Sequence, residues 1–296
     1  MKTILVLTDF SIRADHAAHY ALKLAQKIKA NLLLCNVFAV PAANFISAGV
    51  DWPVENSEVF EEDSKNDLSE LTERLNDILD HTSAADEFRP LIEQCSKAGS
   101  IINAINEIAA SYQVLMAVVG MHFATGFGPF LSDDHTNEII EKVNVPVLVV
   151  PNQMKFSNFD KIAFATDLTY RGIDVLHCLH GITKYFDSEI LITYVADEKI
   201  SDQVEHHNVH NFFNRAITQV KYPKIYYRAI HAKSIVSGLD WLSEHTDIDL
   251  LVLVHRKRNF LQKVFEGSIT QKMASHLIKP MLVFPGGSAH ETLPVF

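Results

Sequence analysis

The chain has few cysteines, no long apolar run and no excess of positive charge, and each lack excludes a class of protein. Its cysteines, Cys35, Cys95 and Cys178, are odd in number and far apart. They predict no disulfide framework and no CxxC site, but buried small side chains in a protein of the reducing cytoplasm. No apolar run approaches the roughly 18 to 20 residues that span a bilayer. The formal net charge of −10 argues against binding to nucleic acids or anionic membranes.

Signals of secretion, catalysis and metal binding are also missing. The N-terminal "MKTILVLTDFS" has neither the longer apolar region nor the cleavage site of a secretory signal, so we interpret it as a first buried strand. The G-x-S-x-G, H-E-x-x-H and P-loop patterns do not occur, and no catalytic residue is predicted. His206 and His210 have the i, i+4 spacing of a zinc pair, but no third ligand is marked. We therefore predict no metal beyond Mg²⁺ carried by a nucleotide.

An internal repeat is the main feature that the sequence does contain. Residues 2–38 align with 160–196 at an offset of 158, and residues 98–151 align with 232–285 at an offset of 134. Two repeats of this length indicate duplicated domains and not a solenoid, whose periods are shorter. The change of offset means that the first repeat carries 24 extra residues, which lie within 39–66.

The repeat sets the domain boundaries that we predict. A first domain spans 1–151, a polar linker 152–158, a second domain 159–286 and a C-terminal tail 287–296. The insertion at about 39–66 is either a surface loop or a lid or partner-contact element, followed by a helix that begins near Ser64.

Apolar runs alternate with helical periodicity in both repeats. Ser11 and Thr169 are placed to cap the first helix of each repeat. The runs that predict buried strands are 3–9, 31–38, 88–94, 115–120 and 145–150, then 161–167, 189–195, 224–230, 250–255 and 279–284. Strands separated by helices favour an α/β fold, here two tandem doubly wound, Rossmann-like domains with parallel sheets. Ligands of such sheets bind beyond the carboxyl ends of the strands.

Three features lie where such a ligand would bind. Asp9 and Asp167 end the first strand of their repeats, where a carboxylate either accepts hydrogen bonds from a base or ribose or begins the turn into the helix. Gly267 and Ser268 precede a helix, and this turn either holds a phosphate or only caps the helix. The basic stretch 255–263 either steers a polyphosphate or is a solvated loop.

The combination "ILVLTDFS", "LLLCNVF", "VVGMH" and "VPVLVVP" resembles the universal stress protein family in its tandem, UspA-like form. The resemblance covers both repeats apart from the insertion and the tail. It implies a five-stranded parallel sheet per domain, a fold like that of the adenine nucleotide alpha hydrolases, and pairing through the last strand. Many members bind ATP, using the strand-one Asp, a Val at the end of strand two and a G-x2-G-x9-G-[S/T] loop after strand four.

Neither repeat matches that whole pattern. The first supplies Asp9, Val37 and Gly120. It then departs from the loop at Phe123, Asp133 and Asp134, while Gly126 and Gly128 are out of register. The second supplies Asp167, Val195, Gly267 and Ser268, but has Val254, His255 and Arg258 in the regions of the first two glycines.

Charge separates the two repeats. Two carboxylates a few ångströms from a triphosphate repel it by about 1 kcal/mol per charge pair in water, and they cancel the attraction of a helix N-terminus. We therefore expect any ATP or other adenine nucleotide only in the second repeat, with His255 and Arg258 near its phosphates. The expected function is binding in a stress response; the alternatives are a nucleotide-free interaction scaffold and a slow ATPase. Expected assemblies are an intramolecular pseudo-dimer, a homodimer of such chains, or a complex with an unidentified protein.

Overall fold

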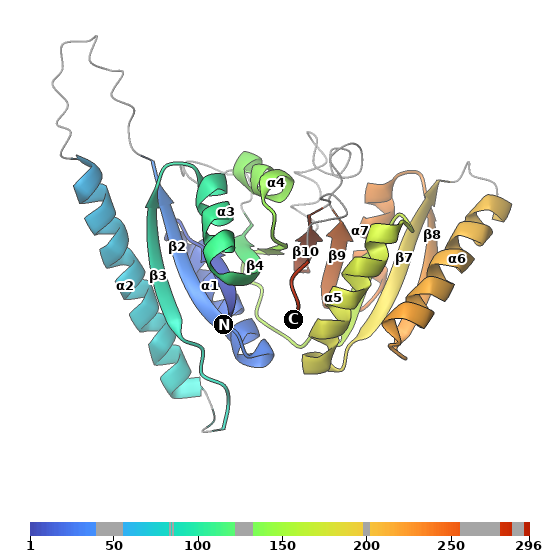
Figure 1. Ribbon diagram of the computed structural model, residues 1–296, viewed down its shortest axis with the longest axis horizontal. Coiled ribbons are helices and arrows are strands. Elements are labelled where there is room, and N and C mark those ends of the chain that lie inside the picture. The colour runs from blue at the N-terminus through green and yellow to red at the C-terminus, as the bar shows by residue number, and fades with distance from the viewer. Residues whose placement is uncertain are drawn as a thin grey trace, which may run out of the picture.

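The computed structural model describes residues 1–39, 56–82, 84, 86–121, 133–197, 202–254, 279–285 and 293–296 (Figure 1). The elements of the first half are, in chain order, β1 (Lys2–Leu7), α1 (Ile12–Ile28), β2 (Asn31–Phe38), α2 (Asn56–Thr82), β3 (Ile92–Ala98), α3 (Ile101–Ser111), β4 (Gln113–Gly120), α4 (Asp133–Lys142) and β5 (Val147–Val150). Those of the second half are β6 (Lys161–Ala165), α5 (Tyr170–Phe186), β7 (Glu189–Asp197), α6 (Asp202–Val220), β8 (Ile225–Ala232), α7 (Ile235–His245), β9 (Leu250–Val254) and β10 (Met281–Phe284).

The ten strands of the described residues form one sheet, in the order β3-β2-β1-β4-β5-β10-β9-β6-β7-β8. Within each half the paired strands are parallel, and between the halves β5 and β10 pair antiparallel. The α/β fold with five strands in each repeat is therefore confirmed. The expected pairing of the two last strands is also present.

The junction between the halves is symmetric. Leu148 of β5 lies opposite Leu282 of β10, and these two residues are equivalent in the internal repeat. On either side, Met281 pairs with Val149 and Val283 with Val147. An approximate two-fold axis therefore passes between the two leucines, and each repeat satisfies the edge strand of the other.

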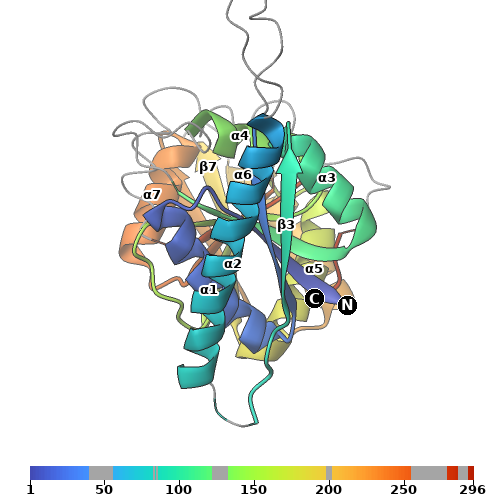
Figure 2. The same ribbon diagram turned by 90° about the vertical axis from the view of Figure 1, so that its left-hand side faces the viewer.

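Two continuous cores cover the two faces of the sheet. One contains side chains of α1, α2, α5 and α6, and the other contains side chains of α3, α4 and α7. Both cores cross the β5–β10 junction, because Leu148 and Leu282 belong to the first while Val147 and Val283 belong to the second. Helices α2 and α6 lie at the two ends of the molecule (Figure 1), and Figure 2 shows α2 beside β3.

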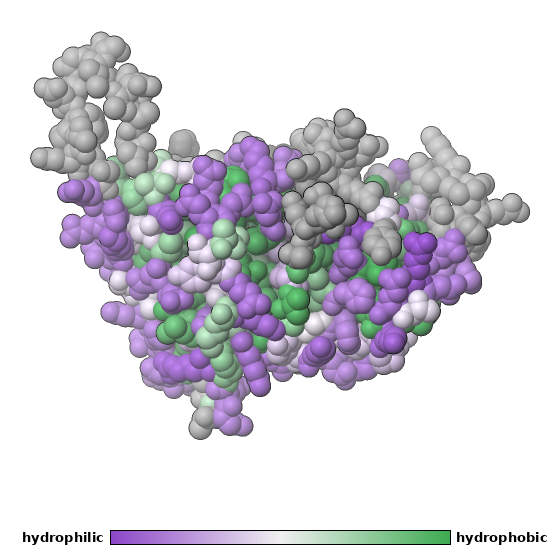
Figure 3. Space-filling model, viewed as in Figure 1, coloured by the Kyte–Doolittle hydropathy of each residue, from purple (hydrophilic) through white to green (hydrophobic). Residues whose placement is uncertain are grey.

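Hydrophilic residues cover most of the face seen in Figure 3, with smaller apolar areas between them. Among the described residues, no helix combines the length and hydropathy that a membrane span requires.

Two expected boundaries are wrong. The helix after the insertion begins at Asn56 and not near Ser64. Its first turns have exposed apolar side chains, such as Val59 at 53% and Phe60 at 42%, and its buried apolar side chains start at Leu68, one turn after the buried but polar Ser64. Periodicity therefore marks only the later part of this helix. The third strand runs from Ile92 to Ala98 and not over 88–94, because the backbone pairing with β2 begins at Ile92.

The linker and the tail both contribute to the core. Phe156 of the linker packs edge-on against Tyr20 of α1, with ring centroids 5.2 Å apart, and against Phe159 at 5.8 Å. The C-terminal Phe296 is buried, and a Cβ added to Gly181 of α5 would lie 3.0 Å from its Cβ. The expected polar linker and tail thus place aromatic rings between the two halves.

Candidate functional site

The segment after the first strand has the same backbone in both halves. The amide of Thr8 donates to the Cys35 carbonyl, and that of Thr166 donates to the Thr193 carbonyl, both at 3.0 Å. The hydroxyl of Thr8 then accepts from the Phe10 amide at 3.0 Å, as the hydroxyl of Thr166 accepts from the Leu168 amide at 3.1 Å.

The central residue of each turn is not glycine although it has a left-handed backbone. Phe10 has φ 61° and Leu168 has φ 62°. Non-glycine residues rarely adopt this conformation, which costs on the order of 1 kcal/mol and persists only where neighbouring groups hold it. The threonine hydroxyls described above supply such a constraint on one side of each turn.

Each strand-ending aspartate closes the other side of its turn. Asp9 Oδ1 accepts from the Ser11 amide at 3.1 Å. Asp167 Oδ1 accepts from the Thr169 amide at 3.4 Å and from the Thr169 hydroxyl at 2.8 Å. The structure therefore gives both aspartates the turn-forming role that the sequence left open.

Surroundings distinguish the two carboxylates. Asp9 is half-buried, whereas Asp167 is exposed. Both follow strands that flank the point where the strand order reverses in their half, between β1 and β4 and between β6 and β9. Of the two carboxylates, Asp167 is therefore the more exposed at this edge of the sheet.

The helix starts also differ. Ser11 caps α1 as expected, because its Oγ accepts from the Ala14 amide at 3.3 Å. Thr169 is the N-cap residue of α5, but its side chain makes no capping hydrogen bond to the helix. Its hydroxyl donates to Asp167 instead.

The structure brings each candidate valine level with the aspartate of its half. Leu7 pairs with Cys35 and Ala165 with Thr193, so Val37 and Val195 lie on the neighbouring strand beside Asp9 and Asp167. Val37 is buried and Val195 is half-buried. A Cβ on Gly238 of α7 would lie 2.6 Å from Cγ1 of Val195, so this glycine is needed for the helix to approach the valine.

Gly120 ends β4 next to β1, where its residue type has a packing reason. A Cβ at this position would lie 2.7 Å from the Arg13 carbonyl oxygen and 3.3 Å from the Ala14 nitrogen. Glycine therefore lets the first turn of α1 reach the strand. The equivalent residue in the second half is Val254, which is half-buried.

Several predicted positions lie outside the described residues: His255, Arg258, Gly267, Ser268, Phe123, Gly126 and Gly128. Asp133 and Asp134 are the first two residues of α4. This agrees with their predicted place at a helix start.

A buried polar cluster in the first half was not anticipated. Ser64 of α2 donates to Asn36 Oδ1 at 2.9 Å and lies 2.7 Å from the Ser96 hydroxyl. Asn36 Nδ2 donates to the Thr8 carbonyl at 2.8 Å, at the start of the aspartate turn. An asparagine inside the buried run "LLLCNVF" needs partners, and this is the signal that the sequence offered.

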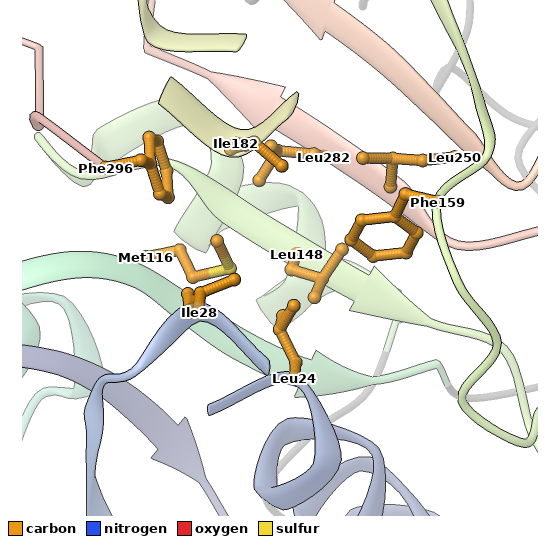
Figure 4. Close-up of a pocket in the computed structure, with 9 residues that line it drawn as sticks. All are labelled: Leu24, Ile28, Met116, Leu148, Phe159, Ile182, Leu250, Leu282 and Phe296. Atoms are coloured by element: carbon orange, nitrogen blue, oxygen red, sulfur yellow. The ribbon is translucent and has the colours of Figure 1, made fainter. Parts of the chain in front are cut away.

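The cavity between the halves is apolar and small. It has a volume of about 10 Å³ and is lined by Leu148 and Leu282 at the strand junction, by Phe159 just after the linker and by Phe296 of the tail (Figure 4). A cavity of this size holds at most one water molecule, which needs polar partners. It is a packing defect and not a ligand site.

No three His, Cys, Asp or Glu side chains are grouped as a metal site among the described residues. His210 Nδ1 lies 3.0 Å from Asn214 Nδ2, while the side chain of His206 is outside the described part.

Comparison with known proteins identifies the family. The model of the universal stress protein family matches residues 1–151. A universal stress protein of Archaeoglobus fulgidus DSM 4304 is 14% identical, with 97% of each chain covered and a TM-score of 0.70. A candidate universal stress protein of Pseudomonas aeruginosa UCBPP-PA14 is 12% identical over 96% of this chain and 92% of its own, with a TM-score of 0.55.

A protein of unknown function from Pseudomonas aeruginosa PAO1 gives the same identity and coverage, with a TM-score of 0.54. No curated protein matches the chain. At these identities the solved structures show the likeness of fold, which extends over both halves, and the family model shows the relationship. The chain belongs to the universal stress protein family.

Proposed function

We propose that this chain acts in a stress response by binding and not by catalysis, and that it binds an adenine nucleotide such as ATP only in its second half. The observation that carries the proposal is the contrast between the two aspartate turns. Asp167 is exposed at the carboxyl edge of the sheet, whereas Asp9 is half-buried. A carboxylate at this edge is suited to accept hydrogen bonds from a base or ribose.

The start of α4 supports the same assignment. Its first two residues are Asp133 and Asp134, both of an acidic residue type, and the start of a helix is its positive end. A triphosphate approaching that end meets repulsion of about 1 kcal/mol per charge pair in water and more in a partly buried site. The equivalent positions in the second half are Gly267 and Ser268, which carry no charge.

Calorimetric titration of the full chain with ATP and with AMP tests the proposal. The expected result is one site per chain, weakened roughly tenfold to a hundredfold by Asp167→Asn, because a hydrogen bond to a charged group contributes about 1.5 to 3 kcal/mol and about 1.4 kcal/mol is a factor of ten in affinity. The matched variant Asp9→Asn leaves the affinity unchanged. Gly267→Asp abolishes binding, and Asp134→Lys does not reduce it.

Three outcomes contradict parts of the proposal. Binding lost in Asp134→Lys but kept in Gly267→Asp moves the site to the first half. If calorimetry detects no binding, and ultraviolet absorbance and mass spectrometry detect no nucleotide in the purified protein, the protein is an interaction scaffold without nucleotide. ATP turnover above the buffer background that disappears in Asp167→Asn makes the protein an enzyme.

A further inference from the structure

Two cysteines that are 60 residues apart in the sequence are direct neighbours in the sheet. Cys35 of β2 and Cys95 of β3 are register partners on parallel strands. Neighbouring strands lie about 4.8 Å apart, and cysteines whose Cα atoms are roughly 4.4 to 6.8 Å apart can form a disulfide. Both thiols are free here, and the interaction between them shifts the pKa of each.

The pair lies on one face of the sheet and is held in register from the other. Cys35 belongs to the core under α3, and Cys95 packs against that core. The next residue on each strand, Asn36 or Ser96, points to the opposite face, where both contact the Ser64 hydroxyl of α2 at 2.9 and 2.7 Å. This cluster joins the two strands at the level of the cysteines, so the thiols stay adjacent.

Access differs between the two thiols. Cys35 is 1% exposed, whereas Cys95 is half-buried on β3, the strand at the edge of the sheet. Lys97, two residues along the same strand, forms an ion pair with Glu107 of α3 at 3.3 Å. A small reagent therefore reaches Cys95 beside a charged surface, while Cys35 is protected behind it.

From this geometry we propose that Cys35 and Cys95 form a reversible, peroxide-sensitive dithiol site, in which Cys95 is oxidised first and Cys35 then closes the disulfide. The inference goes beyond nucleotide binding and does not depend on it. Reversible disulfides of this kind are compatible with a reducing compartment, where they act transiently.

The chemistry balances with one hydroperoxide. The Cys95 thiolate attacks the terminal oxygen, the O–O bond breaks, and the departing alkoxide or hydroxide takes up a proton. This leaves Cys95 as a sulfenic acid. The Cys35 sulfur then attacks the Cys95 sulfur, the S–O bond breaks, and the hydroxide leaves as water with the proton of Cys35. An added dithiol such as dithiothreitol reverses the disulfide by exchange.

Electrostatics supports this order of reaction. The hydrogen bond from the Cys35 thiol and the charge of Lys97 lower the pKa of Cys95, against the opposing effects of partial burial and of Glu107. The hydrogen bond to Cys95 and burial raise the pKa of Cys35. Since the thiolate is the nucleophile, Cys95 is the thiol that attacks peroxide.

The chain contains its own control. Burial raises the pKa of Cys178 on α5 to about 12, which makes this thiol unreactive. In the second half, the register positions that match the pair hold Thr193 and Arg228. The proposed site is therefore specific to the first half.

The experiment treats the reduced full chain with hydrogen peroxide at neutral pH, blocks the remaining thiols with N-ethylmaleimide and maps the peptides by mass spectrometry. We expect the peptides of Cys35 and Cys95 to be linked by a disulfide. We expect Cys178 to carry the maleimide, because peroxide oxidises this thiol on the order of tenfold more slowly than Cys95. Dithiothreitol restores all three thiols. Oxidation of Cys178 at the same rate, or a disulfide between two chains, would overturn the proposal.

Single variants test the order of the two steps, with circular dichroism as the check of folding. In Cys35→Ala, peroxide with dimedone gives an adduct at Cys95, because no thiol closes the disulfide. In Cys95→Ala, Cys35 stays reduced. Dimedone adducts at Cys35 in Cys95→Ala, formed as fast as those at Cys95 in Cys35→Ala, would show that neither thiol has priority. If a variant does not fold, the peptide mapping of the chain without substitutions still tests whether Cys35 and Cys95 form the disulfide.

Discussion

The two halves of the chain build the same turn after their first strand and surround it with different side chains. In the first half, Asn36 ties the turn to α2 through a buried polar cluster. In the second half, Gly172 of α5 takes part, since a Cβ there would lie 2.9 Å from the Thr166 hydroxyl and 3.0 Å from the ring of Phe212 on α6. The backbone of the turn was retained after duplication, while its surroundings diverged. The divergence places a polar cluster and a thiol pair in one half and an exposed carboxylate in the other.

The two halves meet symmetrically at the strand junction, and substitutions there have the largest expected effect on stability. Leu148→Ala and Leu282→Ala each remove a buried side chain and enlarge the cavity that both leucines line, so each lowers the free energy of unfolding by about 3 to 4 kcal/mol. Urea unfolding followed by circular dichroism measures both. If the two equivalent leucines stabilise the protein equally, the two losses of unfolding free energy agree within about 1 kcal/mol. Leu91→Ala, at a residue that is 58% exposed, serves as the control.

The C-terminal residue breaks that symmetry. Phe296 is 6% exposed and packs beside Gly181, whose equivalent in the first half is Lys23. Phe296→Ala is expected to lower the free energy of unfolding by about 3 kcal/mol, at the low end of the range for a core phenylalanine, because its ring lines the small cavity between the halves. Val295→Ala, at a residue that is 73% exposed, leaves stability unchanged. Equal effects of the two variants would mean that the tail is not docked in solution.

Gly120 tests whether a residue of the family's loop pattern is structural here. Gly120→Ala places a Cβ 2.7 Å from a backbone oxygen of α1 and is expected to cost about 1 to 3 kcal/mol of stability. Val254→Ala, at the equivalent position, only removes packing and costs about 1 kcal/mol. Thermal unfolding without any ligand compares them. A stable Gly120→Ala with altered nucleotide binding would assign this glycine to a site instead.

The smallest expected changes in stability come from removing the N-cap side chains of α1 and α5. Ser11→Ala removes the capping hydrogen bond of α1 and is expected to cost about 1 kcal/mol. Thr169→Ala removes no capping bond of α5 and costs about 0.5 kcal/mol or less. Urea unfolding of each variant measures both changes in the free energy of unfolding. The reverse order would contradict the hydrogen bonding described for the two turns.

The sequence predicted what depends on local patterns. Apolar runs ending in Asp9 and Asp167, separated by helical periodicity, were sufficient for the α/β fold and the duplication. The resemblance to the universal stress protein family made the pairing of the last strands an expectation. These features depend on residue types within a short window or on the comparison of two windows, both of which the chain displays directly.

The features that the sequence did not predict depend on strand register and on burial by residues that are far away in the sequence. The contact of Cys35 with Cys95 follows from the alignment of β2 with β3, which an insertion separates in the sequence. The aromatic side chains Phe156 and Phe296 lie in stretches that are polar or short, so no periodicity marks them as core. The candidate phosphate turn at Gly267 and Ser268 lies outside the described residues and stays a prediction.

The pairing of β5 with β10 has a consequence for how the protein behaves on dilution. Strand pairing between separate subunits is lost below the dissociation constant, whereas a short connection keeps the two partners at an effective concentration in the millimolar range. Residues 152–158 provide this connection, and Phe156 within it packs on both neighbours. The ten-stranded sheet is therefore independent of protein concentration, and it persists at the low copy numbers at which a two-chain assembly would separate.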